Sequence, residues 1–179
     1  MSSAARTPSA SQAFAERIDR LNETIGRGAA WLCLFVVVVQ FAVVVLRYVF
    51  GLGSVRLSES IIYAHAGLFM LASAWTLSTG GHVRVDVFYA GTSPRTKATI
   101  DLCGSLFLLL PFMAVLAWFA VPYVSRSWAI LESSRETSGL PAVFLLKTLI
   151  PVFALLMALQ GVSQAIKAMA VLRGPDAPR

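Results

Sequence analysis

The chain has 179 residues, of which 57% are hydrophobic and only 13% are charged, and its formal net charge is +6. Soluble domains of this length carry about 25% charged residues, so this deficit predicts a membrane protein that forms one compact unit. The basic balance is typical of Lys and Arg held at a cytoplasmic membrane surface. Because no basic run with interleaved exposed aromatic residues is present, we expect no nucleic-acid partner.

Residues 1–28 form a predicted cytoplasmic segment. Apolar residues recur within it at helical spacing, at Phe14, Ile18, Leu21 and Ile25. Ser9 and Gln12 have the spacing of a capping box at the start of a helix. The pattern predicts an amphipathic helix that lies on the cytoplasmic membrane surface. A solvated helix packed on a partner is the alternative.

Residues 29–172 form the predicted membrane domain. Four apolar segments, at about 29–50, 61–78, 100–124 and 142–165, match the length of about 20 residues that crosses a bilayer. Because lipid offers no partner to backbone polar groups, we expect an all-α membrane protein with four transmembrane helices. The first span is interpreted as an uncleaved anchor, and Pro111 is expected to kink the third span. Residues 173–179 are predicted to be a disordered tail.

The distribution of Lys and Arg predicts the orientation of the spans. Ten of the fifteen basic residues precede the first span, separate the second from the third, or follow the fourth. Four lie on the opposite side, and Lys147 lies within the fourth span. By the positive-inside rule, both termini are expected in the cytoplasm.

Polar residues in and beside the spans are costly in lipid and are therefore functional candidates. Ser58 is expected to cap the second span, and Glu59 to lie at the positive end of its dipole, with ion binding as the alternative for Glu59. His65 shares a face with small and hydroxyl residues, which predicts a buried, hydrogen-bonded side chain rather than a proton relay. Lys147 is expected to snorkel to the interface, and Gln160 to bond to another helix.

The segment 125–141 is the largest polar stretch on the predicted outer side. Trp128 is a candidate interfacial anchor, while Glu132, Arg135 and Glu136 are expected to face the extracytoplasmic space. A solvated loop and a contact with an extracytoplasmic partner are the two interpretations.

The stretch GGHVRVDVFY follows the second span, and its valines alternate with His82, Arg84 and Asp86. This alternation predicts an extended segment on the cytoplasmic interface, where Arg84 and Asp86 are tied to helix ends. Its two glycines permit a sharp exit from the preceding helix. Residues 92–94, Thr-Ser-Pro, are predicted to form the cap and first turn of the next helix.

Motifs for catalysis are absent from the sequence, and no enzyme activity is expected. His82 is predicted outside the bilayer, so it does not pair with His65 as a haem ligand. Cys33 and Cys103 are expected to pack as reduced apolar residues, and we expect no disulfide, metal or cofactor. The spans show neither an internal repeat nor a carboxylate at mid-depth, which argues against a self-sufficient transporter. An accessory membrane subunit fits these residues better.

Three features lead to a family. They are the Ser-Glu pair at 58–59, the GGHVRVD sequence after the second span, and a set of residues in the fourth span, Lys147, Ile150, Pro151, Leu159, Gln160 and Gly161. Over roughly residues 25–170, the chain resembles the DctQ-like small membrane subunit of tripartite ATP-independent periplasmic (TRAP) transporters.

The resemblance implies a multi-pass protein of the bacterial inner membrane that scaffolds a large permease subunit among membrane lipids. A periplasmic substrate-binding protein would deliver an organic acid or similar solute, and an ion gradient, sodium in this interpretation, would drive uptake. We expect structural or subunit-interface roles for Glu59, His65, His82, Arg84, Asp86, Lys147 and Gln160. Candidates for contact with the binding protein are Trp128, Glu132, Arg135 and Glu136. The alternative is a membrane anchor of a respiratory or other enzyme complex.

Overall fold

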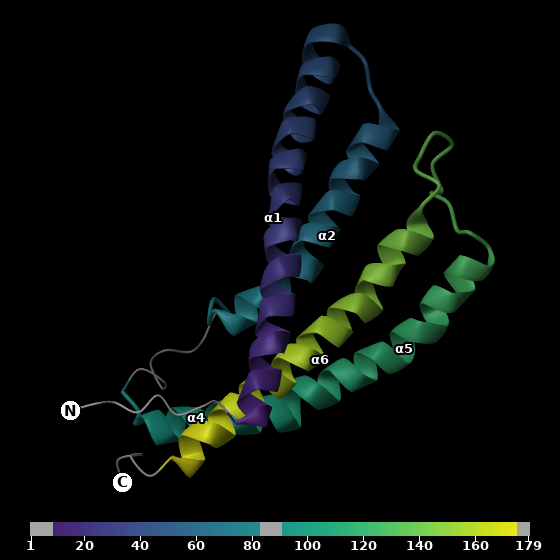
Figure 1. Cartoon of the computed structure of the whole chain (residues 1–179). Helices are drawn as coiled ribbons and strands as arrows, with labels where there is room; N and C mark the ends of the chain where they lie inside the picture. The colour runs from purple at the N-terminus through teal and green to yellow at the C-terminus, as the bar shows by residue number, and fades with distance from the viewer. Residues whose placement is uncertain (1–8, 83–90, 175–179) are drawn as a thin grey trace.

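The computed structural model describes residues 9–82 and 91–174 (Figure 1). Its elements in chain order are α1 (Ala10–Phe50), α2 (Val55–Ser78), α4 (Pro94–Cys103), the π-helical η1 (Gly104–Leu109), α5 (Leu110–Ala129) and α6 (Val143–Arg173). Four helical stretches are long and apolar enough to cross a membrane: α1, α2, the continuous Pro94–Ala129 and α6. The prediction of an all-helical chain with four spans is confirmed, since the described residues include no strand.

The helix α1 is continuous from the predicted cytoplasmic segment through the first span. Ser9 caps it: its backbone N–H donates to the Gln12 side chain at 3.0 Å, and its hydroxyl accepts from the Gln12 N–H at 3.4 Å. This is the predicted capping box. With 41 residues at about 1.5 Å per residue, α1 is about 60 Å long, twice the thickness of a bilayer core.

The first part of α1 packs on α6 and is not a separate surface helix. Ala15 and Ile18 are buried, while Phe14 and Leu21 of the predicted apolar face are 52% and 47% exposed. The buried face is therefore shifted toward smaller residues, which allow a closer approach of the two helix backbones.

The helices form two antiparallel hairpins, α1 with α2 and α5 with α6 (Figure 1). The start of α1, the end of α6 and α4 lie together at what we call the terminal end of the molecule. The hairpins diverge toward the other end, the loop end, which carries residues 51–54 and 130–142. A small core joins the hairpins and consists of Ala74, Met113, Ala154, Leu156 and Met157.

Glycine sets the closeness of α1 and α2. A Cβ atom at Gly26 would lie 2.6 Å from the Cβ atom of Trp75, so only glycine fits there without a shift. Gly28 has open space around it instead.

One predicted helix start is corrected by the structure and another is confirmed. The N-cap of α2 is Ser54, which accepts from the Leu57 N–H at 3.4 Å, and not Ser58. Ser58 lies inside the helix, where its hydroxyl donates to the Ser54 carbonyl at 3.1 Å. The cap of α4 is confirmed, since Ser93 accepts from the Thr96 N–H at 3.2 Å with proline as the next residue.

The GGHVRVDVFY stretch is described only at its start. Gly80 has a φ of +72°, a left-handed conformation that favours glycine and gives the predicted sharp exit from α2. His82 is exposed. Arg84 and Asp86 lie outside the described residues.

The third span differs from a regular helix close to Pro111. The π-helical η1 ends at Leu109, just before this proline. Because proline has no N–H, the carbonyl of Phe107 lacks its usual donor four residues on, and a change of helical pitch is a common response.

Candidate functional site

A first polar cluster, the terminal-end cluster, joins α1 to α6 and consists of Asp19, Asn22, Gln160, Ser163 and Lys167. Asn22, Gln160 and Ser163 are at most 1% exposed. The Asn22 amide donates to Gln160 Oε1 at 2.7 Å, and the Gln160 amide donates to Asp19 Oδ1 at 3.0 Å. Ser163 Oγ donates to the same Asp19 oxygen at 2.7 Å, and Lys167 forms an ion pair with Asp19 Oδ2. Gln160 thus bonds across helices, at the centre of this cluster.

Asp19 stays ionised in these surroundings. Partial burial raises the pKa of its carboxyl, but the hydrogen bonds from Lys167, Gln160 and Ser163 outweigh burial and hold the pKa below its usual value. Asn22 Oδ1 is buried without a hydrogen-bond partner among the described residues. An incompletely satisfied buried network of this kind favours one register of two helices at a cost in stability.

A second polar cluster, the loop-end cluster, ties the segment 130–142 to the start of α2. Glu59 Oε1 accepts a hydrogen bond from Ser134 Oγ, and Glu59 Oε2 accepts from the Leu140 N–H at 2.5 Å. The Ser134 N–H donates to the Leu140 carbonyl at 3.1 Å, which closes the segment on itself. A Cβ atom at Gly139 would lie 2.4 Å from Ser134 Oγ and 2.8 Å from Glu59 Oε1, so glycine leaves room for both members of this hydrogen bond.

These bonds set the charge of Glu59. The hydrogen bond from Ser134, followed by that from the Leu140 N–H, lowers the pKa of its carboxyl below the usual 4.5. The carboxylate therefore acts as a double acceptor for a loop that is distant in sequence. The prediction that Glu59 lies at the positive end of the helix dipole is wrong, because α2 begins at Val55 and has no acidic residue in its first turn.

Glu132 and Lys147 pair with each other inside the α5–α6 hairpin. Lys147 Nζ forms an ion pair with Glu132 Oε2, and the same oxygen accepts from Ser127 Oγ at 2.7 Å. Lys147 Nζ also lies 4.2 Å from the centroid of the Tyr123 ring. The bond from Lys147, and then that from Ser127, lowers the pKa of the Glu132 carboxyl. Within this chain Lys147 therefore contacts an acid rather than snorkelling alone, and Glu132 turns inward.

The remaining candidates of the segment 125–141 divide into two groups. Trp128 donates to Thr148 Oγ1 at 2.9 Å and packs edge-on against Phe144 with ring centroids 4.6 Å apart. Arg135 and Glu136 are exposed. Two of the four predicted contacts for a binding protein thus have intrachain partners, and two point to solvent.

His65 contradicts the expectation of a buried, hydrogen-bonded histidine within this chain. Its side chain is exposed, stacks on Phe69 with centroids 6.5 Å apart, and has no hydrogen bond to another described residue. The reason is that the small residues Ala64, Gly67 and Ala74 occupy the buried face of α2. Gln40 in the first span is exposed as well.

Sequence reasoning missed most of the terminal-end cluster. Gln160, Ser163 and Lys167 follow one another at spacings of three and four, so they share one face of α6. Asp19 and Asn22 are likewise three residues apart on α1. This polar spacing was the available signal, but it does not reveal that the two stripes face each other.

The described residues include no group of three or more His, Cys, Asp or Glu that would hold a metal ion. The family model described as "Tripartite ATP-independent periplasmic transporters, DctQ component" matches residues 29–171. No curated protein and no solved structure matches the chain.

Proposed function

Because the chain belongs to the family of DctQ components of tripartite ATP-independent periplasmic transporters, it is the small membrane subunit of such a transporter, and we propose that it scaffolds the large permease subunit. In this proposal, the terminal end faces the cytoplasm of a bacterium and the loop end faces the periplasm. The assembled transporter takes up an organic acid or similar solute delivered by a binding protein, driven by a sodium gradient.

The observation that carries the scaffold proposal is the outward position of His65. A polar side chain in a membrane span is costly against lipid and usually meets a protein group or a water-filled space. Within this chain His65 has neither burial nor a hydrogen-bond partner among the described residues. A polar group of the large subunit is the partner that would make this position favourable.

The limited internal packing supports the same proposal. The most apolar 18-residue windows of the four spans have only 6% to 22% of their residues buried inside this chain. Most of the span surface is therefore left for lipid and for the large subunit. The two polar clusters use their bonds within the chain, which supports a structural role for them.

The experiment is co-purification of the tagged chain with the large subunit, combined with solute uptake in reconstituted vesicles. His65→Leu is expected to reduce the recovered large subunit by about threefold to just under twentyfold, because an interhelical hydrogen bond in a membrane contributes about 0.6 to 1.7 kcal/mol. Arg95→Leu is the control, since Arg95 is exposed at the start of α4 and is not among the expected interface residues. Full recovery and full uptake with His65→Leu would contradict the proposed interface.

The membrane-anchor alternative is tested with the same preparation. An anchor of a respiratory complex would carry a haem or a quinone, whereas the scaffold subunit is expected to show no Soret band in its visible spectrum. A haem spectrum that persists after stringent purification would refute the scaffold function.

A further inference from the structure

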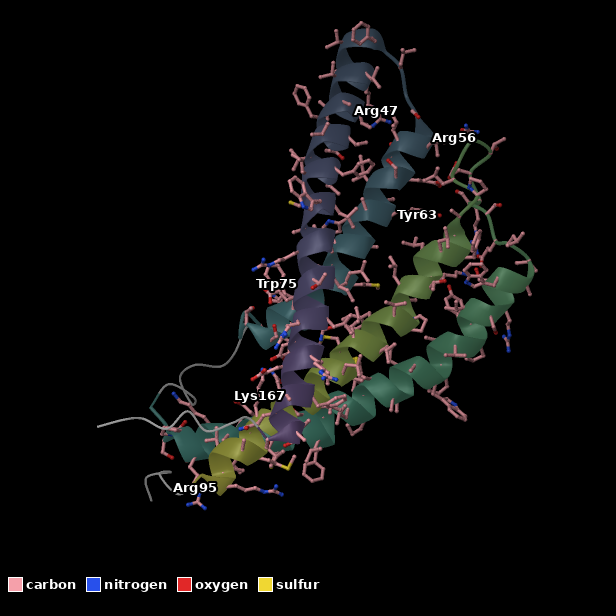
Figure 2. The ribbon with its side chains drawn as sticks, in the orientation of Figure 1. Arg47, Arg56, Tyr63, Trp75, Arg95 and Lys167 are labelled. Atoms are coloured by element: carbon pink, nitrogen blue, oxygen red, sulfur yellow. The ribbon has the colours of Figure 1, made fainter. Side chains whose placement is uncertain are left out.

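Four arginines lie at the loop end of the molecule, two on each hairpin. Arg47 lies in the last turn of α1 and Arg56 in the first turn of α2 (Figure 2), while Arg126 lies near the end of α5 and Arg135 in the segment 130–142. All four are exposed, and none has an ion-pair partner among residues 9–82 and 91–174. We call them the loop-end arginines.

The acids at this end neutralise the loop-end arginines only in part. Glu59 accepts its two hydrogen bonds from the neutral donors Ser134 and Leu140. Glu132 forms its ion pair with Lys147 and is also attracted by the charge of Arg135. Glu136 is the one exposed acid that the described residues place at this end. Counting every charged side chain that the described residues place at this end, the four arginines and Lys147 face Glu59, Glu132 and Glu136, which leaves a surplus of two positive charges.

Membrane topology does not explain this surplus. If the loop end faces the periplasm, as the proposed function requires, the positive-inside rule disfavours cationic residues here. Helix dipoles favour cations at helix C-termini, which applies to Arg47 and Arg126, but not to Arg56 at a helix N-terminus or to Arg135 in a loop. At least two of the loop-end arginines therefore need another explanation.

The choice of side chain indicates what they bind. All four exposed cations are arginine, whereas the lysine of this end, Lys147, is used internally. The guanidinium group presents a planar set of donors that binds carboxylates in a bidentate fashion, and arginine is enriched in protein interfaces from which lysine is depleted. Carboxylates on a protein surface suit this group.

We propose that the loop-end arginines form a docking surface for an acidic face of the soluble substrate-binding protein. This inference rests on the proposed function, because it requires a periplasmic loop end and a delivered substrate. It adds the chemistry of the contact. A positive surface on this subunit would bind a carboxylate-rich surface on the binding protein, and the long-range attraction between the two would accelerate their association.

The test uses the complete complex of small and large subunits in vesicles, with uptake measured against the concentration of substrate-loaded binding protein. The double variant Arg56→Glu/Arg135→Glu is expected to raise the half-saturating concentration of binding protein about tenfold, because each exposed ion pair contributes modestly to the free energy of docking. The maximal rate should not change, since these residues act only on the encounter with the binding protein. Arg95→Glu is the control, since Arg95 is exposed at the terminal end (Figure 2). Because salt screens charge attraction, added salt should raise the half-saturating concentration of the wild type more than that of the double variant.

Two results would overturn the docking surface. One is an unchanged half-saturating concentration in the double variant. The other is an effect seen in vesicles of anionic phospholipid but lost in purely zwitterionic vesicles, which would assign the arginines to lipid headgroups. Should the double variant assemble poorly, Arg56→Gln and Arg135→Gln alone, each with an expected increase of about threefold, decide the question. Intact assembly with wild-type half-saturation refutes only the docking surface, whereas failure of the unmodified chain to bind the large subunit refutes the proposed function.

Discussion

Gln160 offers the sharpest test of the internal packing. It is fully buried and links Asn22 to Asp19 across α1 and α6. In Gln160→Leu, the Asn22 amide loses its acceptor while Asn22 stays 1% exposed, and Asp19 loses one donor. A buried polar group without a partner costs about 1 to 3 kcal/mol, so the variant is expected to lose about that much stability.

The double variant Asn22→Leu/Gln160→Leu separates the lost bond from the cost of burial. Asn22→Leu alone leaves Gln160 Oε1 without its donor, and should also cost about 1 to 3 kcal/mol. In the double variant no orphaned amide remains at this contact, so the loss should be smaller than the sum of the two single losses by about 1 kcal/mol or more.

Unfolding by sodium dodecyl sulphate in mixed micelles, followed by circular dichroism, measures these free energies. Gln40→Leu is the control, because the same substitution at an exposed span position should change stability by less than about 0.5 kcal/mol. Single losses below about 0.5 kcal/mol, or strict additivity in the double variant, would refute the assigned role of the network.

The remaining predictions concern glycines and Glu59. Gly26→Ala should destabilise the chain by about 1 to 3 kcal/mol, since its Cβ atom would meet Trp75; Gly28→Ala, in open space, should be neutral or stabilising, and equal effects would argue against this packing. Glu59→Ala should accelerate hydrogen exchange of the Leu140 amide about tenfold, because its acceptor is gone; unchanged protection would show that the bond contributes nothing. Gly139→Ala should have the same effect, since its Cβ atom would meet both Ser134 and the Glu59 carboxylate. In the wild type, ionised Glu59 stabilises the loop fully above pH 4.5, and because its pKa is lowered in the folded state, this stabilisation should be lost as pH falls below 4.5 through the folded-state pKa; protection of Leu140 that stays constant from pH 7 down to the pH at which the whole chain unfolds would contradict it.

The number of spans was predictable because it follows from hydrophobic length alone. The capping box at Ser9 and the cap at Ser93 were predictable because they depend on residues within one turn. The N-cap of α2 was not, since Ser54 and Ser58 both fit a cap and only the extent of the helix decides between them.

Contacts between segments that are distant in the sequence could not be predicted from hydrophobic periodicity, because periodicity describes one helix at a time. Glu59 was identified as a polar residue at a helix start, but its donors lie 75 and 81 residues further along the chain. His65 was expected to be buried because its face carries small residues. The neighbouring face carries even smaller ones, and they pack against α1, where a Cβ atom at Gly67 would lie 3.1 Å from Leu32.

The divergence of the two hairpins has a mechanical consequence. Polar contacts connect the hairpins at both ends, through Asp19 and Gln160 at one and through Glu59 at the other, with a small apolar core between them. A slip of α1 along α6 by one turn, about 5.4 Å, would separate the Asp19 carboxylate from its donors. A wider angle between the hairpins would instead pull the segment 130–142 from Glu59. Sliding is therefore opposed by the bonds of Asp19, and opening by the bonds of Glu59. The relative position of the hairpins depends on polar contacts at the two ends of the molecule more than on the size of the apolar core.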